Sequence, residues 1–188
     1  MVSMTYRRVL RELAEGQHGY VTTQDACALG VPPVELRKLA HRGALTNIAR
    51  GLYRFPDVRH TASDSYAEAV LRVGPGAHID GESVLAMLDL AAVEPRRITV
   101  ATPRRVRLVD PGRLNVITRH TPPKEITEYD GIPATRVWRA LTDAKGKVMT
   151  DRLREALREA QRRDLVTTLE ARRVRRALSD DPTTETFA

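Results

Sequence analysis

Cations are the most numerous ionisable residues of this 188-residue chain. Lysine and arginine together number 31, aspartate and glutamate number 24, and the formal net charge is therefore +7. A balance of this kind favours anionic partners such as nucleic acid. Two cationic stretches lie in segments with helical spacing, RKLAHR at residues 37–42 and RRVRR at residues 172–176.

The first cationic stretch lies in a segment, PVELRKLAHR, that predicts a helix from Pro33 to Arg42. Its apolar side chains Leu36, Leu39 and Ala40 share one face. The opposite face carries Val34, Arg37, Lys38, His41 and Arg42. A helix of this kind can dock its apolar face on its own domain and leave its cationic face free to enter a DNA major groove.

The residues before this helix predict the rest of a helix-turn-helix. Residues 4–15 have the apolar spacing of an amphipathic helix. Thr22 and Asp25 form a capping pattern at the start of a short second helix. Gly30 ends that helix, and Pro33 suits the first position of the next one.

The residues after the helix predict a wing. Two short strands near 44–48 and 52–55 flank a turn at Ala49-Arg50-Gly51, where the glycine supports the change of direction. A hairpin directly after a recognition helix is typical of winged helix-turn-helix domains. Arg50 at its tip could then reach a phosphate or a minor groove.

The remaining sequence predicts a second domain of mixed structure. Residues 56–64 are polar, include a proline and suggest a linker. Helical and strand-like segments then alternate, with a hairpin turn at Asp130-Gly131 and two closing helices near 150–163 and 167–178. We therefore predict an α+β protein: a winged helix-turn-helix in residues 1–58, then a mixed α/β domain with a C-terminal helix pair in residues 62–180. A disordered tail is expected at 181–188.

The second cationic stretch has three readings. On a helix, Arg172, Arg173 and Arg176 point away from the apolar face that contains Val174. They could form a second DNA contact or a dock for an acidic protein surface. They could equally be a solvated helix face that Glu170 partly neutralises, with arginines that suit a helix C-terminus.

Catalytic patterns are weak in this sequence. No spacing typical of a metal site or of H-E-x-x-H occurs among the histidines, which are His18, His41, His60, His78 and His120. Ser83 lies outside a nucleophile elbow and is expected to pack at a helix start. An acidic group, Asp80, Glu82 and Asp89, could serve a nuclease metal site, although no lysine follows at a suggestive spacing. We expect no enzymatic activity, catalytic residue, cofactor or metal.

Cysteine content and hydropathy set further limits. Cys27 is the only cysteine, so an internal disulfide is not possible, and its Ala-rich surroundings predict a buried structural thiol. No apolar run approaches the roughly 18 residues that a membrane span needs. The N-terminal residues lack the apolar block of a signal peptide. We therefore expect a cytoplasmic protein that does not bind membranes.

The chain resembles the AbiEi family of antitoxins, from bacterial systems classed as type IV toxin–antitoxin. The resemblance covers about residues 4–178. It is carried by LGVPPVELRKLAHRGALTNIARGLYRF, by AEAVLRVGPGAHIDGESVLAMLDL, and by YDGIPATRVWRALTD with the helix pair RLREALREAQRRDLVTTLEARRVRRAL. Pro32 departs from the pattern, because relatives often have Ser or Thr as the cap of the recognition helix.

The resemblance implies two roles. The N-terminal domain would bind double-stranded DNA at repeats in its own promoter and repress its operon. The C-terminal domain would counteract a toxin of the nucleotidyltransferase type, with or without direct contact. The alternative is a stand-alone winged-helix regulator whose C-terminal domain senses a ligand or dimerises.

Overall fold

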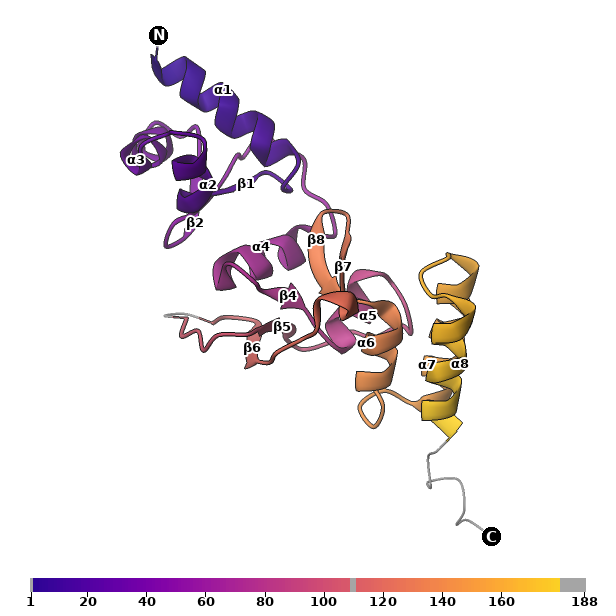
Figure 1. The fold of residues 1–188 in the computed structure, drawn as a ribbon. Coiled ribbons are helices and arrows are strands. Elements are labelled where there is room, and N and C mark those ends of the chain that lie inside the picture. The colour runs from indigo at the N-terminus through magenta and orange to yellow at the C-terminus, as the bar shows by residue number, and fades with distance from the viewer. Residues whose placement is uncertain (1, 109–110, 180–188) are drawn as a thin grey trace. The chain divides into compact units, whose positions relative to one another are not determined.

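The protein, here as a computed structural model, is described over residues 2–108 and 111–179 (Figure 1). The chain divides into two compact units, Met1–Pro75 and Gly76–Ala188. This division falls later in the chain than the linker predicted at residues 56–64. The assignment of DNA binding to residues 1–58 and of an antitoxin role to residues 62–180 stays a prediction. The predicted disordered tail lies outside the described residues. Both helices and sheets are present, as the predicted α+β class requires.

The first unit has the predicted order of helices followed by a hairpin. It contains α1 (Val2–Glu15), β1 (Tyr20–Thr22), α2 (Thr23–Ala28), α3 (Pro33–His41), β2 (Thr46–Ala49), β3 (Leu52–Arg54) and α4 (Asp64–Val73). The three strands form an antiparallel sheet with β3 in the middle. Strand β1 was not foreseen, because three residues are too short to show the alternation of a strand.

The core of this unit explains why α1, α2 and α3 gather around the sheet (Figure 1). Leu10 of α1, Leu36 and Leu39 of α3, Val21 of β1 and Phe55 after β3 belong to one buried apolar cluster. Spacings of three in α3 place both leucines on its inner face. The predicted separation of α3 into an apolar and a polar face is therefore confirmed.

The start of α2 has the predicted capping box. The Asp25 amide donates to Thr22 Oγ1 at 3.0 Å, and the Thr22 amide donates to Asp25 Oδ2 at 2.8 Å. The prediction that Cys27 is buried was wrong, because its side chain is exposed. Helix α2 has only six residues and turns Ala26 into the core, so the next residue points outward.

The second unit is built on a five-stranded mixed sheet. It contains β4 (His78–Ile79), α5 (Glu82–Met87), β5 (Ile98–Thr102), β6 (Leu114–Thr118), η1 (Pro123–Glu125), β7 (Ile126–Tyr129), β8 (Ile132–Thr135), α6 (Val137–Asp143), α7 (Thr150–Arg162) and α8 (Thr168–Ser179). The strand order is β6-β5-β4-β8-β7. The predicted hairpin at Asp130-Gly131 joins β7 and β8, and both turn residues have positive φ.

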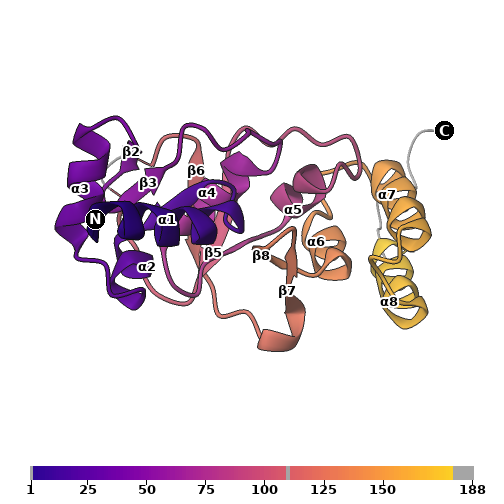
Figure 2. The same cartoon turned by 90° about the horizontal axis from the view of Figure 1, so that it is seen from above.

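The two closing helices, α7 and α8, lie side by side (Figures 1 and 2). Buried residues at helical spacing face inward from both, namely Leu153, Ala156, Leu157 and Ala160 from α7 and Ala171, Val174 and Leu178 from α8. This confirms the predicted helix pair. In the described part of the chain, no helix has the length and apolar character needed to cross a membrane.

Candidate nucleic-acid interface

Helix α3 presents a polar surface that we call the α3 outer face, made of Val34, Arg37, Lys38 and His41. All four side chains are exposed, as is Arg42 at the C-terminal cap of the helix. Their spacings of three and four residues place them on the side opposite Leu36 and Leu39. The structure therefore exposes every α3 residue that the sequence proposed for DNA contact, and their DNA contact stays a prediction.

The start of α3 is shaped by proline. Pro33 occupies the first helical position, and the cap residue Pro32 makes no side-chain hydrogen bond. The Glu35 amide donates to the Pro32 carbonyl at 2.9 Å, which closes the first turn. Helix α3 therefore begins without a Ser or Thr side-chain cap, as the sequence indicated, and the fixed φ of proline stabilises that start.

The cations of the α3 outer face differ in their surroundings. Lys38 Nζ lies 2.8 Å from Glu35 Oε1, so this ammonium already has a carboxylate partner on its own helix. Arg37 and His41 form no ion pair with any carboxylate in residues 2–108 or 111–179. Arg37 is therefore better placed than Lys38 to meet a new anion.

The wing is short, and its turn is attached to the helix-turn-helix. Arg50 is exposed in the turn between β2 and β3, and Gly51 beside it has φ of 74°. The Gly51 carbonyl accepts a hydrogen bond from the Thr23 amide at 2.8 Å, at the first residue of α2. A Cβ at Gly51 would lie 3.1 Å from Thr23 Oγ1, so glycine allows this close approach. The predicted wing is thus present, with Arg50 at its tip.

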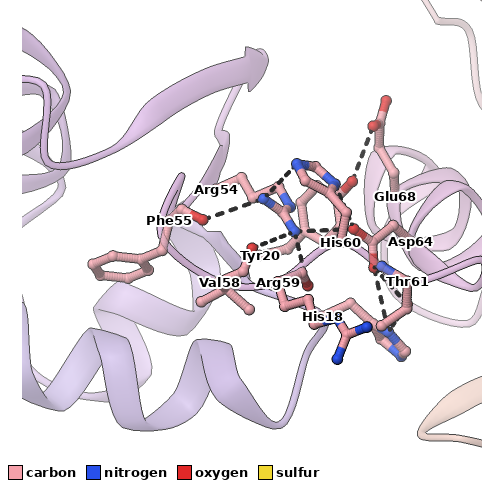
Figure 3. A network of polar contacts seen from close by, with 10 residues as sticks. All are labelled: His18, Tyr20, Arg54, Phe55, Val58, Arg59, His60, Thr61, Asp64 and Glu68. Carbon is pink, nitrogen blue, oxygen red and sulfur yellow. Dashed lines mark hydrogen bonds and ion pairs between the residues drawn. The ribbon is translucent and has the colours of Figure 1, made fainter.

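A buried ion pair fixes the wing to helix α4 (Figure 3). Arg54 of β3 is 3% exposed, and its Nη2 lies 2.9 Å from Asp64 Oδ2 at the start of α4. The same nitrogen donates to the Val58 carbonyl at 3.0 Å, and the guanidinium lies 5.6 Å from the centroid of the Tyr20 ring. Arg54 of β3 therefore contacts β1, the segment that joins β3 to α4, and the start of α4 itself.

Asp64 gathers further donors at the same place (Figure 3). Thr61 Oγ1 donates to Asp64 Oδ1 at 2.7 Å, and His60 Nδ1 lies 2.8 Å from Asp64 Oδ2. Burial opposes ionisation of this carboxyl, but the hydrogen bonds from Thr61 and the charge of Arg54 outweigh it, so the pKa of Asp64 lies below its usual value.

The sequence treated this region as a polar linker and missed that it is bonded to the wing. The local contact is a turn in which the Asp64 carboxylate accepts from the Thr61 amide and hydroxyl, whereas the N-cap of α4, Ser63, makes no side-chain hydrogen bond. Nothing in the sequence pairs Asp64 with Arg54, ten residues earlier.

Helix α8 carries the second cationic surface, the α8 basic face, made of Leu169, Arg172, Arg173 and Arg176. These side chains are exposed, and with Ala177 they line a surface hollow of about 470 Å³. The Arg173 guanidinium lies 5.1 Å from the centroid of the Trp138 ring, which orients it. The three arginines are thus on one face, as predicted, and the choice among their three readings stays open.

The residues considered for catalysis take part in contacts within the second unit. Asp80 is buried, with Arg119 Nη1 at 2.7 Å from Oδ2 and Thr135 Oγ1 at 3.2 Å from Oδ1. Ser83 Oγ accepts the Thr99 amide at 2.8 Å, which fits the predicted packing role at a helix start. Within residues 2–108 and 111–179, no group of three or more His, Cys, Asp or Glu side chains could hold a metal ion.

Burial also sets the protonation of one histidine. His78 of β4 is buried, and its Nε2 lies 3.0 Å from Thr121 Oγ1. Burial lowers the pKa of His78, although the nearby Gly76 carbonyl and the Asp80 charge oppose this. His78 is thus accounted for as a neutral, hydrogen-bonded residue of the interior.

Comparison with known families places a match on the first unit. Residues 8–56 match a family described as transcriptional regulator, AbiEi antitoxin. The matched segment runs from α1 through the wing and includes the α3 outer face and Arg50. Among curated proteins, none matches this sequence.

Proposed function

We propose that the protein binds operator repeats in its own promoter and represses its operon, because residues 8–56 match a family described as transcriptional regulator, AbiEi antitoxin. The observation that carries the proposal is the α3 outer face. It combines an exposed Arg37 with an adjacent wing that carries Arg50. Helix, turn and wing in this order are how winged helix-turn-helix proteins place a recognition helix in the major groove.

Physical chemistry assigns different tasks to the candidate residues. Arginine can donate two hydrogen bonds to guanine O6 and N7, so Arg37 is the candidate for base recognition. Arg42 at the end of α3 and Arg50 on the wing are candidates for phosphate contacts, which position a protein on the duplex. Lys38 and His41 complete the surface, with Lys38 exchanging its Glu35 partner for a phosphate.

We further propose that the second unit counteracts a nucleotidyltransferase-type toxin without catalysing a reaction. The family match supports an antitoxin role in general terms. The α8 basic face is a candidate for an acidic partner surface, because three exposed arginines surround the exposed Leu169. On this proposal the protein works in the cytoplasm, where its DNA and its toxin would be.

The operator proposal is tested by fluorescence anisotropy with the full chain and a labelled duplex from the region upstream of its gene. Wild-type protein should bind this duplex more tightly than a scrambled one, and Arg37→Ala should reduce that preference. Arg154→Ala is the matched control, because it removes one exposed charge from α7. Equal affinity of wild type for both duplexes would refute operator binding.

The antitoxin proposal is tested by co-expression with the product of a neighbouring nucleotidyltransferase gene. Full-length Arg37→Ala should still relieve growth inhibition, because its second unit is unchanged. Loss of both repression and rescue in this variant would show that the two roles are not divided as proposed. A regulator that senses a ligand or dimerises would repress but give no rescue even as wild type.

A further inference from the structure

Val34 is an apolar residue at the N-terminal end of the α3 outer face, whose other members are cationic or titratable. It is the second residue of α3, and 41% of its surface is exposed. Arg37 and Lys38 follow at three and four residues, and His41 follows at seven, so Val34 belongs to the same exposed face. A single exposed valine is common on proteins, and its significance here comes from its position on this helix.

The Val34 side chain is held in a defined place. Pro33 precedes it at the first helical position, and the buried Leu36 fixes the first turn to the core. A β-branched side chain in a helix has one strongly preferred rotamer, so the two methyl groups of Val34 point in a fixed direction. A rigid apolar side chain of this kind can distinguish a surface that carries a matching apolar group from one that lacks it.

The major groove of DNA contains one kind of apolar group that an exposed valine could contact. The edges of the base pairs there are polar except for the C5 methyl of thymine, which small apolar side chains contact. The N-terminal residues of a recognition helix are the ones that reach base edges, and Val34 is at that end of α3.

We propose that Val34 packs against the C5 methyl of a thymine and makes that base a specificity determinant of each operator half-site. The inference rests on the proposed DNA binding and adds what the surface reads. Arg37, one turn further along α3, then contacts a base or phosphate beside this thymine. A 5-methylcytosine carries its methyl group at the same place in the groove, so it satisfies the same contact.

The test uses the full chain and duplexes selected by it from a randomised pool. Each thymine of a selected duplex is replaced in turn by uracil, which removes only the C5 methyl. Replacement of one thymine per half-site should weaken binding about three- to ten-fold, the range expected for one buried methyl group. Replacement of the same base by 5-methylcytosine, paired with guanine, should weaken binding less than replacement by cytosine.

Protein variants assign the effect to Val34. Val34→Ser should abolish the difference between thymine and uracil, whereas Val34→Thr, which keeps one methyl group, should retain part of it. Leu29→Ala is the matched control, since Leu29 is equally exposed at 41% but follows α2. Unchanged thermal melting of Val34→Ser would show that its fold is intact.

The outcomes separate this inference from the proposed function. Wild type that binds selected duplexes but tolerates uracil at every position overturns the role of Val34 and leaves DNA binding standing. Val34→Ser that keeps the full preference for thymine overturns it as well. If wild type enriches no duplex from the pool, the proposed operator binding fails, and the inference fails with it.

Discussion

Helices α3 and α8 have the same pattern and different surroundings. Each buries an apolar stripe and exposes several cations on the opposite face. Around α3 lie a preceding turn and helix and a following wing that ends at Arg50, whereas Arg173 of α8 is stacked on Trp138 and Arg175 bonds to Gln161. Cationic periodicity alone therefore does not identify a helix that reads DNA. The elements before and after the helix provide that distinction.

The largest expected effect concerns the buried Arg54–Asp64 ion pair, which lies in the same unit as α3. Asp64→Ala leaves the Arg54 guanidinium buried without its carboxylate, and removing one partner of a buried pair costs about 3–5 kcal/mol. Hydrogen exchange at the β3 amides should report this loss. Fluorescence of Trp138, in the second unit, should show an almost unchanged transition.

A control for this prediction is Glu12→Ala, which removes an exposed partner of Arg8. Pairs exposed to this degree contribute about 0–1 kcal/mol, so exchange at β3 should change little. Equal effects of the two substitutions would contradict the assignment of Asp64 as the anchor of α4.

Acid should weaken the same anchor. Because the pKa of Asp64 is lowered in the folded protein, its contribution is fully present above the ordinary carboxyl pKa of about 3.9. That contribution is lost as pH falls through the lower folded value. Wild type should therefore lose stability in the first unit below about pH 4 more steeply than Asp64→Asn, which has no carboxyl to protonate. If wild type and Asp64→Asn lost stability equally as pH falls, the stabilising role of the Asp64 carboxylate would be contradicted.

Arg37 and Arg176 provide the direct contrast between the two helices. Arg37→Ala should weaken operator binding by about 1–3 kcal/mol if this side chain reads a base. Arg176→Ala removes the same charge from the α8 basic face and should leave affinity within a factor of about three, a screened surface effect. Isothermal titration with one selected duplex measures both. A larger loss for Arg176→Ala would reverse the roles assigned to the two helices.

Arg50 should contribute through the salt dependence of binding. A phosphate contact releases condensed counterions, so each one adds about 0.9 to the slope of log affinity against log salt. Arg50→Ala should lower that slope by about one without changing which sequence is preferred. If Arg50→Ala kept the wild-type slope, Arg50 would not contact a DNA phosphate.

The smallest expected effect is a gain. Glu35→Gln removes the carboxylate beside Lys38, which frees the ammonium and removes a negative charge from α3, the helix proposed to face DNA. The Lys38 side chain is 52% exposed and that of Glu35 is 15% exposed. Pairs at the protein surface are worth about 0.2–1 kcal/mol, so binding should tighten by no more than about five-fold. Glu12→Gln on α1 is the matched control. Weaker binding by Glu35→Gln would mean that Lys38 needs its partner in order to be positioned.

The same comparison shows what the sequence could predict. The inner and outer faces of α3 follow from helical spacing, and the capping box of α2 and the hairpin at Asp130-Gly131 follow from local turn chemistry, so all of these were predictable. The Arg54–Asp64 pair was not, because it joins a strand residue to a helix start through the fold. Cys27 was misjudged because an Ala-rich segment gives no clear inner face over six residues.

An amide chemical-shift map of the full chain, recorded as a selected duplex is added, shows directly which helix meets DNA. We expect the largest changes at Val34, Arg37 and His41 of α3 and at Arg50 of the wing, with smaller ones along α8. Changes confined to α8, with the α3 outer face unaffected, would contradict the claim that α3 is the helix that reads DNA.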